Sequence, residues 1–279
     1  MFKFNLQFTE QIRLAVENAR KSKPLAGSIT NFVTVNFVAN AQLAAGGSAA
    51  MVYLPDEGEG LVKMGDSMYI NVGTLLPIYE ETVPRTLNAL CKLGKPWVLD
   101  PVAVGLGEMR TKLLLQCKEY KPSVIRGNAS EIIALAGLWQ VGGRASSKVR
   151  GVDSTDTVDE AVVAAKALAA WTGGAVAVSG AEDFITDGRH DAVSYGGSPM
   201  MECVTGSGCS LGGVIAVYAA VADPFIAALT GTAAYNLAGR RAEVKAAGTG
   251  SFQQIFLDEL YQASPEDISQ NPISYKEEP

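Results

Sequence analysis

Two glycines and a cysteine lie close together in residues 204–212, which read Val-Thr-Gly-Ser-Gly-Cys-Ser-Leu-Gly. Residues 200–204 are predicted to form a short strand, and the apolar run after the glycines is typical of a buried helix. The first N–H groups of a helix lack internal partners and lie at the positive end of its dipole, so this turn predicts an anion site. Gly206 and Gly208 would let the backbone approach a ligand, and Cys209 would lie where a thiol pKa is lowered. A tight turn beside a structural cysteine is the alternative, because the glycine motif alone is weak.

Polar residues also follow three apolar runs that are predicted to be strands. Asp100 follows one run, Arg126 with Asn128 and Glu131 follows the next, and Ser179 follows a third. In an open parallel sheet, ligands bind at the carboxyl ends of the strands. These residues would therefore meet at one rim, together with the glycine turn.

That collection meets the needs of phosphoryl transfer from a nucleotide. A guanidinium can bind phosphate, carboxylates can hold Mg²⁺ through water, and backbone N–H groups can stabilise developing negative charge. Each residue also has a structural alternative. Asp100 could start a turn before Pro101, Arg126 could form a surface ion pair, and Glu131 could contact the start of a helix.

Alternating strand and helix patterns predict the scaffold that would position these groups. Short apolar strands without polar alternation favour a mostly parallel sheet buried between two helix layers, which is a three-layer α/β/α fold. We expect one domain over residues 1–279, with a small hairpin at one sheet edge, a polar loop at 28–31 and a frayed polar tail at about 264–279. The expected strands are residues 49–54, 68–72, 96–99, 123–125 and 175–178, the hairpin is 184–195, and the expected helices are 9–21, 32–45, 79–92, 110–120, 130–136, 159–171, 210–222, 224–246 and 251–263.

The composition excludes several classes of protein. Hydrophobic residues make up 48% of the 279 residues and charged residues 19%, which predicts a large core. The net charge of −6 argues against nucleic-acid binding, which needs a basic face. Four cysteines without CxxC spacing and a single histidine, His190, argue against zinc, disulfides and a histidine triad. No apolar run is long enough for a membrane span, so a reduced, cytoplasmic protein is expected.

Several segments, in this order and spacing, resemble the hydroxyethylthiazole kinase family of the ribokinase-like superfamily. The resemblance covers about residues 10–262, and it is specific because many motifs agree rather than one. Sister kinases of the fold present Asp where this chain has Cys209, so the cysteine favours the thiazole kinases. The matching segments are residues 28–31, 34–37 with 39–40, the strand end at Met51, 71–75, 99–102, 125–131, 204–209 and 250–252.

The resemblance implies ATP-dependent phosphorylation of the hydroxyl of 4-methyl-5-(2-hydroxyethyl)thiazole, for thiamine biosynthesis or salvage. It also implies a homotrimer with thiazole sites between subunits, and no nucleic-acid or membrane partner. Two departures, Gly27 where His is expected and the stretch 180–183, concern fine substrate contacts. By resemblance, Asn31, Met51 and Gly206 bind the thiazole, Arg126, Ser179, Asn128, Thr205 and Gly208 serve the nucleotide, Asp100 and Glu131 organise Mg²⁺, and Cys209 lies near the substrate hydroxyl in the general-base position.

Two other functions remain open from the sequence. A dehydratase of the same fold that repairs hydrated nicotinamide cofactors would carry Asp at position 209, so Cys209 counts against it. A non-catalytic nucleotide-binding or assembly protein would be expected to lack some of Asp100, Arg126 and Glu131, which are all present. A nicotinamide-binding Rossmann enzyme is poorly supported, because no GxGxxG follows the first strand.

Overall fold

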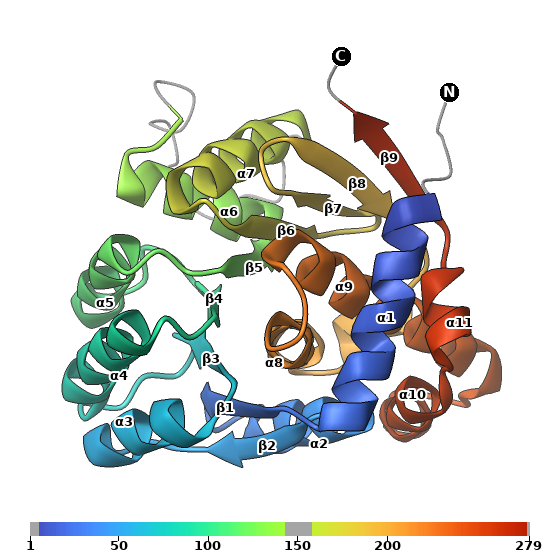
Figure 1. Ribbon diagram of the computed structural model, residues 1–279, viewed down its shortest axis with the longest axis horizontal. Coiled ribbons are helices and arrows are strands. Elements are labelled where there is room, and N and C mark those ends of the chain that lie inside the picture. The colour runs from blue at the N-terminus through green and yellow to red at the C-terminus, as the bar shows by residue number, and fades with distance from the viewer. Residues whose placement is uncertain (1–5, 143–157, 278–279) are drawn as a thin grey trace.

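One mixed sheet runs through the part of the chain that the computed structural model describes, residues 6–142 and 158–277. Within these residues, nine strands lie in the order β2-β1-β3-β4-β5-β6-β7-β8-β9 (Figure 1). Their bounds are β1 Leu25–Ile29, β2 Ser48–Met51, β3 Ser67–Asn71, β4 Trp97–Asp100, β5 Val124–Asn128, β6 Ala175–Ser179, β7 Asp183–Thr186, β8 His190–Ser194 and β9 Ile273–Glu277.

Strands β1 to β6 pair in parallel, and β7 to β9 continue the sheet beyond β6 as an antiparallel part. The parallel pairs are β2 with β1, β1 with β3, and then each strand with the next as far as β6. β6, β7, β8 and β9 pair antiparallel. The central strands β3 and β4 are buried along their whole length, which explains why their sequences lack polar alternation. The predicted hairpin is β7 with β8, but β9 pairs with β8 and forms the sheet edge in its place.

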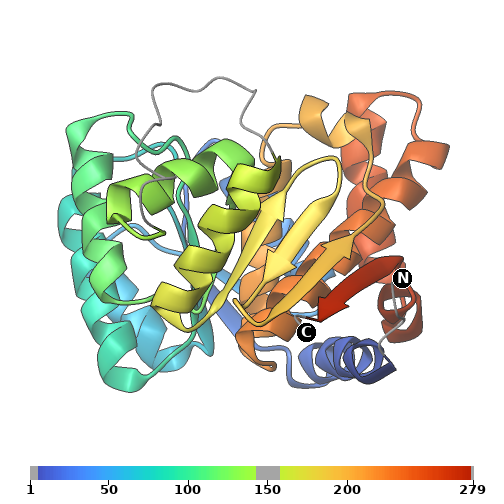
Figure 2. The same cartoon turned by 90° about the horizontal axis from the view of Figure 1, so that it is seen from above.

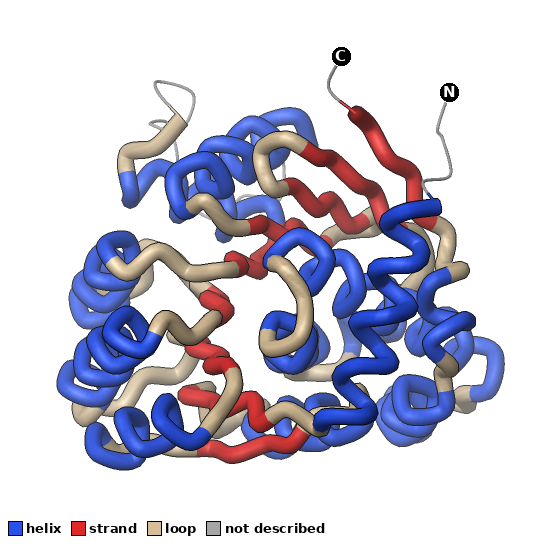
Figure 3. The backbone as a smooth tube through the Cα atoms, viewed as in Figure 1, coloured by secondary structure: helices blue, strands red, loops and turns tan. Residues whose placement is uncertain are grey.

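Helices cover both faces of the sheet (Figures 1 and 3). Successive strand residues point to opposite faces. Trp97 and Leu99 therefore pack with one layer, and Val98 packs with the other. The first layer is α3 Pro55–Met64, α4 Tyr79–Leu93, α5 Glu108–Glu119, α6 Ala129–Trp139 and α7 Val158–Thr172, and the second is α1 Leu6–Ser22, α2 Val35–Ala44, α8 Ser207–Ala219, α9 Pro224–Lys245, α10 Thr249–Gln262 and α11 Pro265–Ser269. This three-layer α/β/α arrangement is the predicted fold.

Small residues let α8 pack closely across the middle of the sheet. A Cβ on Gly212 would lie 2.4 Å from the ring of Tyr69 on β3, and one on Gly213 would lie 2.8 Å from Val38 on α2. Because only glycine avoids these contacts, α8 can lie directly over the strands. The start of α8 is thereby fixed beside the carboxyl ends of β3, β4 and β5, with which the helix is in contact.

Two local predictions were wrong. Residues 28–31 were expected to form a polar loop, but Ser28 and Ile29 end strand β1. Ser28 is fully buried. Its hydroxyl is satisfied there, because Oγ accepts a hydrogen bond from Gln42 Nε2 at 3.1 Å. Residues 200–204 were expected to form a strand, but they lie largely in a 3₁₀ helix, Pro199–Cys203. A proline at its first position and the Ser198 side chain, which accepts a bond from Met200 N–H, favour the helical turn.

The C-terminal segment is ordered rather than frayed, which corrects the third prediction. Ser264 caps α11, and β9 then adds to the sheet beside β8 (Figure 2). Tyr275 on β9 is only 8% exposed, and its ring lies 5.2 Å from that of Phe8 on α1. The alternation of apolar and polar residues along β9 is a strand signal that the prediction overlooked. Residues 1–5, 143–157 and 278–279 of the expected domain lie outside the described residues.

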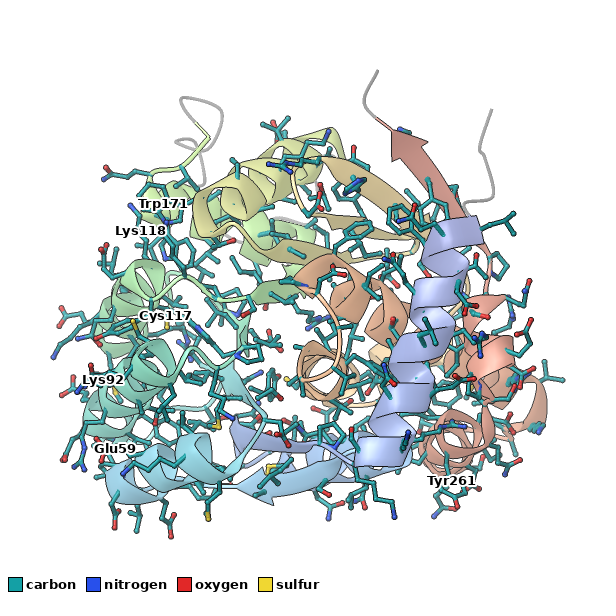
Figure 4. All side chains as sticks on the ribbon, viewed as in Figure 1. Glu59, Lys92, Cys117, Lys118, Trp171 and Tyr261 are labelled. Carbon is teal, nitrogen blue, oxygen red and sulfur yellow. The ribbon has the colours of Figure 1, made fainter. Side chains whose placement is uncertain are left out.

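Two of the cysteines outside the central turn lie on helices of the first layer, α4 and α5. Cys117 lies on α5 within the core of the first helix layer (Figure 4), and burial raises the pKa of its thiol to about 12. It is therefore chemically inert. The next residue, Lys118, links α5 to α7, because its Nζ lies 4.7 Å from the ring centre of Trp171 (Figure 4). Cys91 on α4 is exposed.

Candidate active site

Five of the polar residues singled out in the sequence lie along the carboxyl ends of the parallel strands. Asn31 follows β1, Asp100 ends β4, Arg126 lies in β5, and Ser179 ends β6. Cys209 joins them from the first turn of α8, which is the helix start predicted for it. The α/β topology thus brings together residues up to 178 positions apart, such as Asn31 and Cys209.

Asp100 is the most deeply buried charged group of the site. Its exposed fraction is 0%, and its Oδ2 accepts hydrogen bonds from Tyr69 Oη at 2.8 Å and Asn71 Nδ2 at 3.0 Å. Arg126 Nη1 lies 3.6 Å from the same oxygen. The other oxygen, Oδ1, is buried with no hydrogen-bond partner. Burial raises the pKa of Asp100 to about 6, although Arg126 opposes that shift.

Arg126 is a buried cation held at both ends of its guanidinium. It is 8% exposed, and its Nε and Nη2 donate to Ser179 Oγ at 3.2 and 3.0 Å. A Cβ on Gly208 would lie 2.6 Å from Nη1. Gly208 therefore makes room for the guanidinium beside the first turn of α8, so two groups that favour anions are adjacent.

The Cys209 thiol faces two amide groups. Its Sγ lies 3.3 Å from Asn71 Nδ2 and 3.6 Å from Asn31 Nδ2. Burial and the negative charge of Asp100 raise its pKa, although Arg126 opposes that shift. The expectation of a lowered pKa at the helix start was therefore wrong, because burial and a nearby carboxylate outweigh the helix dipole. At neutral pH this group is a thiol.

Glu131 and Asn128 cap the start of α6. Asn128 Oδ1 accepts from Glu131 N–H at 2.8 Å, and Glu131 Oε2 accepts from Asn128 N–H at 2.9 Å. This is a capping box, so the structural alternative for Glu131 is present in the fold. The remaining oxygen, Oε1, lies 3.4 Å from the N–H of Ala103 in the loop after β4.

The other predicted residues surround this cluster at varying depth. Gly206 adopts φ +90, and a Cβ there would lie 2.9 Å from Thr34, so the turn needs glycine for its backbone and for that neighbour. Thr205 is exposed in the same turn. Met51 ends β2, pairs with Ser28 on β1 and packs against the core on the α8 side.

A sequence model described as the hydroxyethylthiazole kinase family matches residues 16–266. The chain belongs to the hydroxyethylthiazole kinase family. The prediction of a kinase of the ribokinase-like fold is thereby confirmed.

Similar proteins cover most of the chain. A protein from Bifidobacterium animalis subsp. lactis, named hydroxyethylthiazole kinase, is 48% identical over 275 residues, covering 95% of this chain and 91% of its own. One of the same name from Cereibacter sphaeroides is 44% identical over 251 residues, covering 90% and 93%. The solved structure of hydroxyethylthiazole kinase from Pyrococcus horikoshii superposes with a TM-score of 0.85 at 30% identity, over 96% and 100% of the two chains. Pyridoxal kinase from Staphylococcus aureus shares the fold alone, with a TM-score of 0.57 at 16% identity over 78% and 88%.

Two residues of the kinase site were missed as site residues in the sequence. Tyr69 and Asn71 both contact Asp100 from β3, and Asn71 lies directly opposite Asp100 in the strand pairing. Their alternate positions in the strand predicted at 68–72 place both side chains on the same face. That spacing was the available signal, since two polar groups on one face of a buried strand need partners.

The kinase offers few carboxylates for a metal ion. No group of three or more His, Cys, Asp or Glu residues that could hold one lies within residues 6–142 and 158–277. Mg²⁺ in nucleotide enzymes needs only one or two carboxylates besides water and phosphate oxygens. The Oδ1 of Asp100 has no hydrogen-bond partner and is a carboxylate oxygen of the kind that binds Mg²⁺.

Over the same described residues, no helix is long and apolar enough to cross a membrane.

Proposed function

We propose that this chain transfers the γ-phosphoryl group of ATP to the hydroxyl of 4-methyl-5-(2-hydroxyethyl)thiazole, giving the thiazole phosphate used in thiamine biosynthesis or salvage. The observation that carries the proposal is the contact between Asp100, Arg126 and the start of α8 in a member of this family. Relatives 44–49% identical carry the name of this activity. The single sheet between two helix layers supports one kinase domain.

The phosphate end of the site is formed by Arg126, Ser179 and the glycine turn. Arg126 cannot lose its proton at working pH, and Ser179 fixes its guanidinium from one side. At the start of α8 the Ser207 N–H donates to the Val204 carbonyl at 3.3 Å, and the N–H groups after it, that of Gly208 among them, would bind phosphate oxygens beside Thr205. These groups stabilise the charge that spreads over the transferred phosphoryl group.

Asp100 and Glu131 would hold Mg²⁺, with Asn128 keeping Glu131 in place. Mg²⁺ held there would supply positive charge that neutralises the negative charge of the phosphate groups. The unpartnered Asp100 Oδ1 supports this role, because a buried carboxylate oxygen without a donor is costly unless a ligand satisfies it. Glu131 supports it less directly, since one of its oxygens already caps α6.

The thiazole end would comprise Cys209, Gly206, Asn31 and Met51, with the substrate hydroxyl beside the thiol. A thiol is a weak base, and its pKa here is raised rather than lowered. A loose transition state needs little proton abstraction, because positioning and electrostatic stabilisation supply most of the rate. Cys209 therefore suits a reaction in which the acceptor must be placed rather than ionised.

A second subunit would complete the thiazole pocket in a homotrimer. Large apolar side chains are exposed in the loops that follow β1, β2 and β3, on the same end of the sheet as the site. Phe32 is 49% exposed, Val33 60%, Leu54 49% and Leu76 37%. Exposed apolar side chains in the loops after three neighbouring strands favour burial against another chain. Sedimentation should give a trimer, and a fully active monomer would contradict shared sites.

The test is ADP release with Mg·ATP and the thiazole alcohol, run beside hydroxymethylpyrimidine, pyridoxal and a blank without acceptor. We expect turnover that requires both the thiazole alcohol and Mg²⁺. Arg126→Met should remove phosphate binding and serves as the inactive control. Turnover with another alcohol would refute the substrate assignment, and the absence of turnover with every acceptor would refute the kinase activity itself.

A further inference from the structure

The side chain of Asn71 lies between the carboxylate and the thiol of the site. Its Nδ2 is 3.0 Å from Asp100 Oδ2, 3.3 Å from Cys209 Sγ and 2.9 Å from Tyr69 Oη. Asn71 is 1% exposed, so water does not compete for these contacts. None of the roles proposed above uses this amide, although it is the group that contacts both Asp100 and Cys209.

The orientation of the amide is fixed by the backbone. Asn71 Oδ1 accepts from Gly73 N–H at 2.9 Å and from Asn31 Nδ2 at 3.0 Å. A backbone N–H can only donate, so the oxygen must face Gly73 and the NH₂ group must face the cluster. Asn31 is oriented in the same way, because its Oδ1 accepts from Thr34 N–H at 3.2 Å. Both NH₂ groups are therefore directed toward Cys209.

We propose that Asn71 is a positioning residue for phosphoryl transfer, holding the Cys209 sulfur at a fixed place beside Asp100. The amide donates toward both groups and separates them, so the thiol is presented to the acceptor hydroxyl instead of bonding to the carboxylate. Asn31 supports this arrangement through its bond to Asn71 Oδ1. The inference rests on the proposed function and adds the residue through which the thiol is placed.

The kinetic test is a double-mutant cycle with Asn71→Leu, which keeps a similar size and removes the donor. Misplacement of a reacting group by about 1 Å can cost about a hundredfold in rate. We expect Asn71→Leu to lower kcat by about a hundredfold while the Kd for the thiazole alcohol changes less than about threefold. In the Cys209→Ala background the same change should lower kcat by less than about threefold, because the sulfur through which it acts is gone.

If Asn71→Leu still lowers kcat about a hundredfold in the Cys209→Ala background, the inference is overturned, since Asn71 would then act through Asp100 or through folding.

Asn271→Leu is the matched control. Asn271 is 3% exposed and donates to Ser194 Oγ and to the Tyr195 carbonyl at the far sheet edge. It should lower the melting temperature and leave kcat unchanged. If Asn71→Leu does not fold, Asn71→Ser, which is too short to reach the sulfur, takes its place.

A second measurement needs no substrate, and so separates this inference from the proposed function. Iodoacetamide labelling of Cys209, followed by peptide mass spectrometry, reports on the thiol of the free protein. Loss of the Asn71 donor should slow labelling at least about threefold, because an N–H group that donates to sulfur stabilises the thiolate. Asn271→Leu should label at the wild-type rate. Unchanged labelling in the Asn71 variants would overturn the contact, whereas failed turnover of wild type would overturn only the function.

Discussion

Replacing Gly208 by alanine should displace the guanidinium of Arg126. The new Cβ would lie 2.6 Å from Nη1 and 2.7 Å from Nη2, whereas ordinary contacts begin near 3.4 Å. The guanidinium must therefore retreat by about 0.8 Å, the difference between 3.4 and 2.6 Å. It cannot do so freely, because it is bonded to Ser179 Oγ and lies 3.6 Å from Asp100.

The cost should fall on nucleotide binding rather than on folding. Alanine is a better helix former than glycine at Gly208, which offsets part of the strain in Arg126. A hydrogen bond to a charged group contributes about 1.5–3 kcal/mol, and about 1.4 kcal/mol corresponds to a factor of ten. Loss of one guanidinium–phosphate contact should therefore raise the KM for ATP by roughly tenfold to a hundredfold, with a melting temperature near that of wild type.

Steady-state ADP release at varied ATP concentration measures this change, with thermal unfolding run on the same samples. Gly250→Ala is the matched control, because a Cβ at Gly250 meets nothing within 4 Å on α10. It should leave the KM for ATP unchanged. An unchanged KM in a folded Gly208→Ala protein would refute the reasoning, since it would mean that the position of Arg126 does not govern phosphate binding.

Three further predictions concern the acid, the thiol and the tail. Cys209→Ala should slow turnover by about tenfold to a thousandfold while Cys209→Asp stays active; complete loss in a folded alanine variant would instead indicate a covalent thiol mechanism. The pKa of Asp100 is about 6 in the folded protein, whereas an aspartate in the unfolded chain has its ordinary value of 3.8. The native state therefore keeps a proton that the unfolded chain releases, and the free energy of unfolding should fall by up to about 3 kcal/mol as pH rises from 4 to 6. Urea titrations without metal or nucleotide should show that Asp100→Asn lacks this part of the slope, and parallel curves would count against it. Tyr275→Ala should lower the free energy of unfolding by about 3 kcal/mol through lost packing on Phe8, with kcat unchanged; equal urea midpoints would mean that β9 contributes nothing.

Hydrophobic patterning was sufficient for β2 to β8 and for the three layers, whereas β1 and β9 were missed. It failed where polar side chains are satisfied inside the fold. The apolar run at 175–178 predicted β6 because nothing in it needs a distant partner. Ser28 was assigned to a loop because its partner, Gln42, lies on another element and cannot be inferred from local sequence. Helix α3 was missed although Pro55 and the acidic residues after it are a helix-start signal.

The site could be predicted as a set of residues but not as a geometry. Asp100, Arg126 and Ser179 follow apolar strands, and that alone placed them on one rim. The pKa of Cys209 could not be predicted in the same way. Its direction depends on burial and on Asp100, which is 109 positions away in the chain and adjacent only after folding. Asn71 was not predicted as a site residue for the same reason, because its contacts with Asp100 and Cys209 form only after folding.

The order of elements along the chain has a consequence during synthesis on the ribosome. All six parallel strands are made before α8, which begins at Ser207 and, with α9, covers the middle of one face of the sheet. About 180 residues separate the start of β1 from α8, so at roughly 5–20 residues per second β1 waits about 10–40 s for that helix. Val98 and Val124 are made later and wait about 5–20 s. A nascent chain stalled before α8 would have α1 and α2 but would leave the apolar side chains in the middle of this face exposed. The interval is therefore the period when the chain most needs a chaperone.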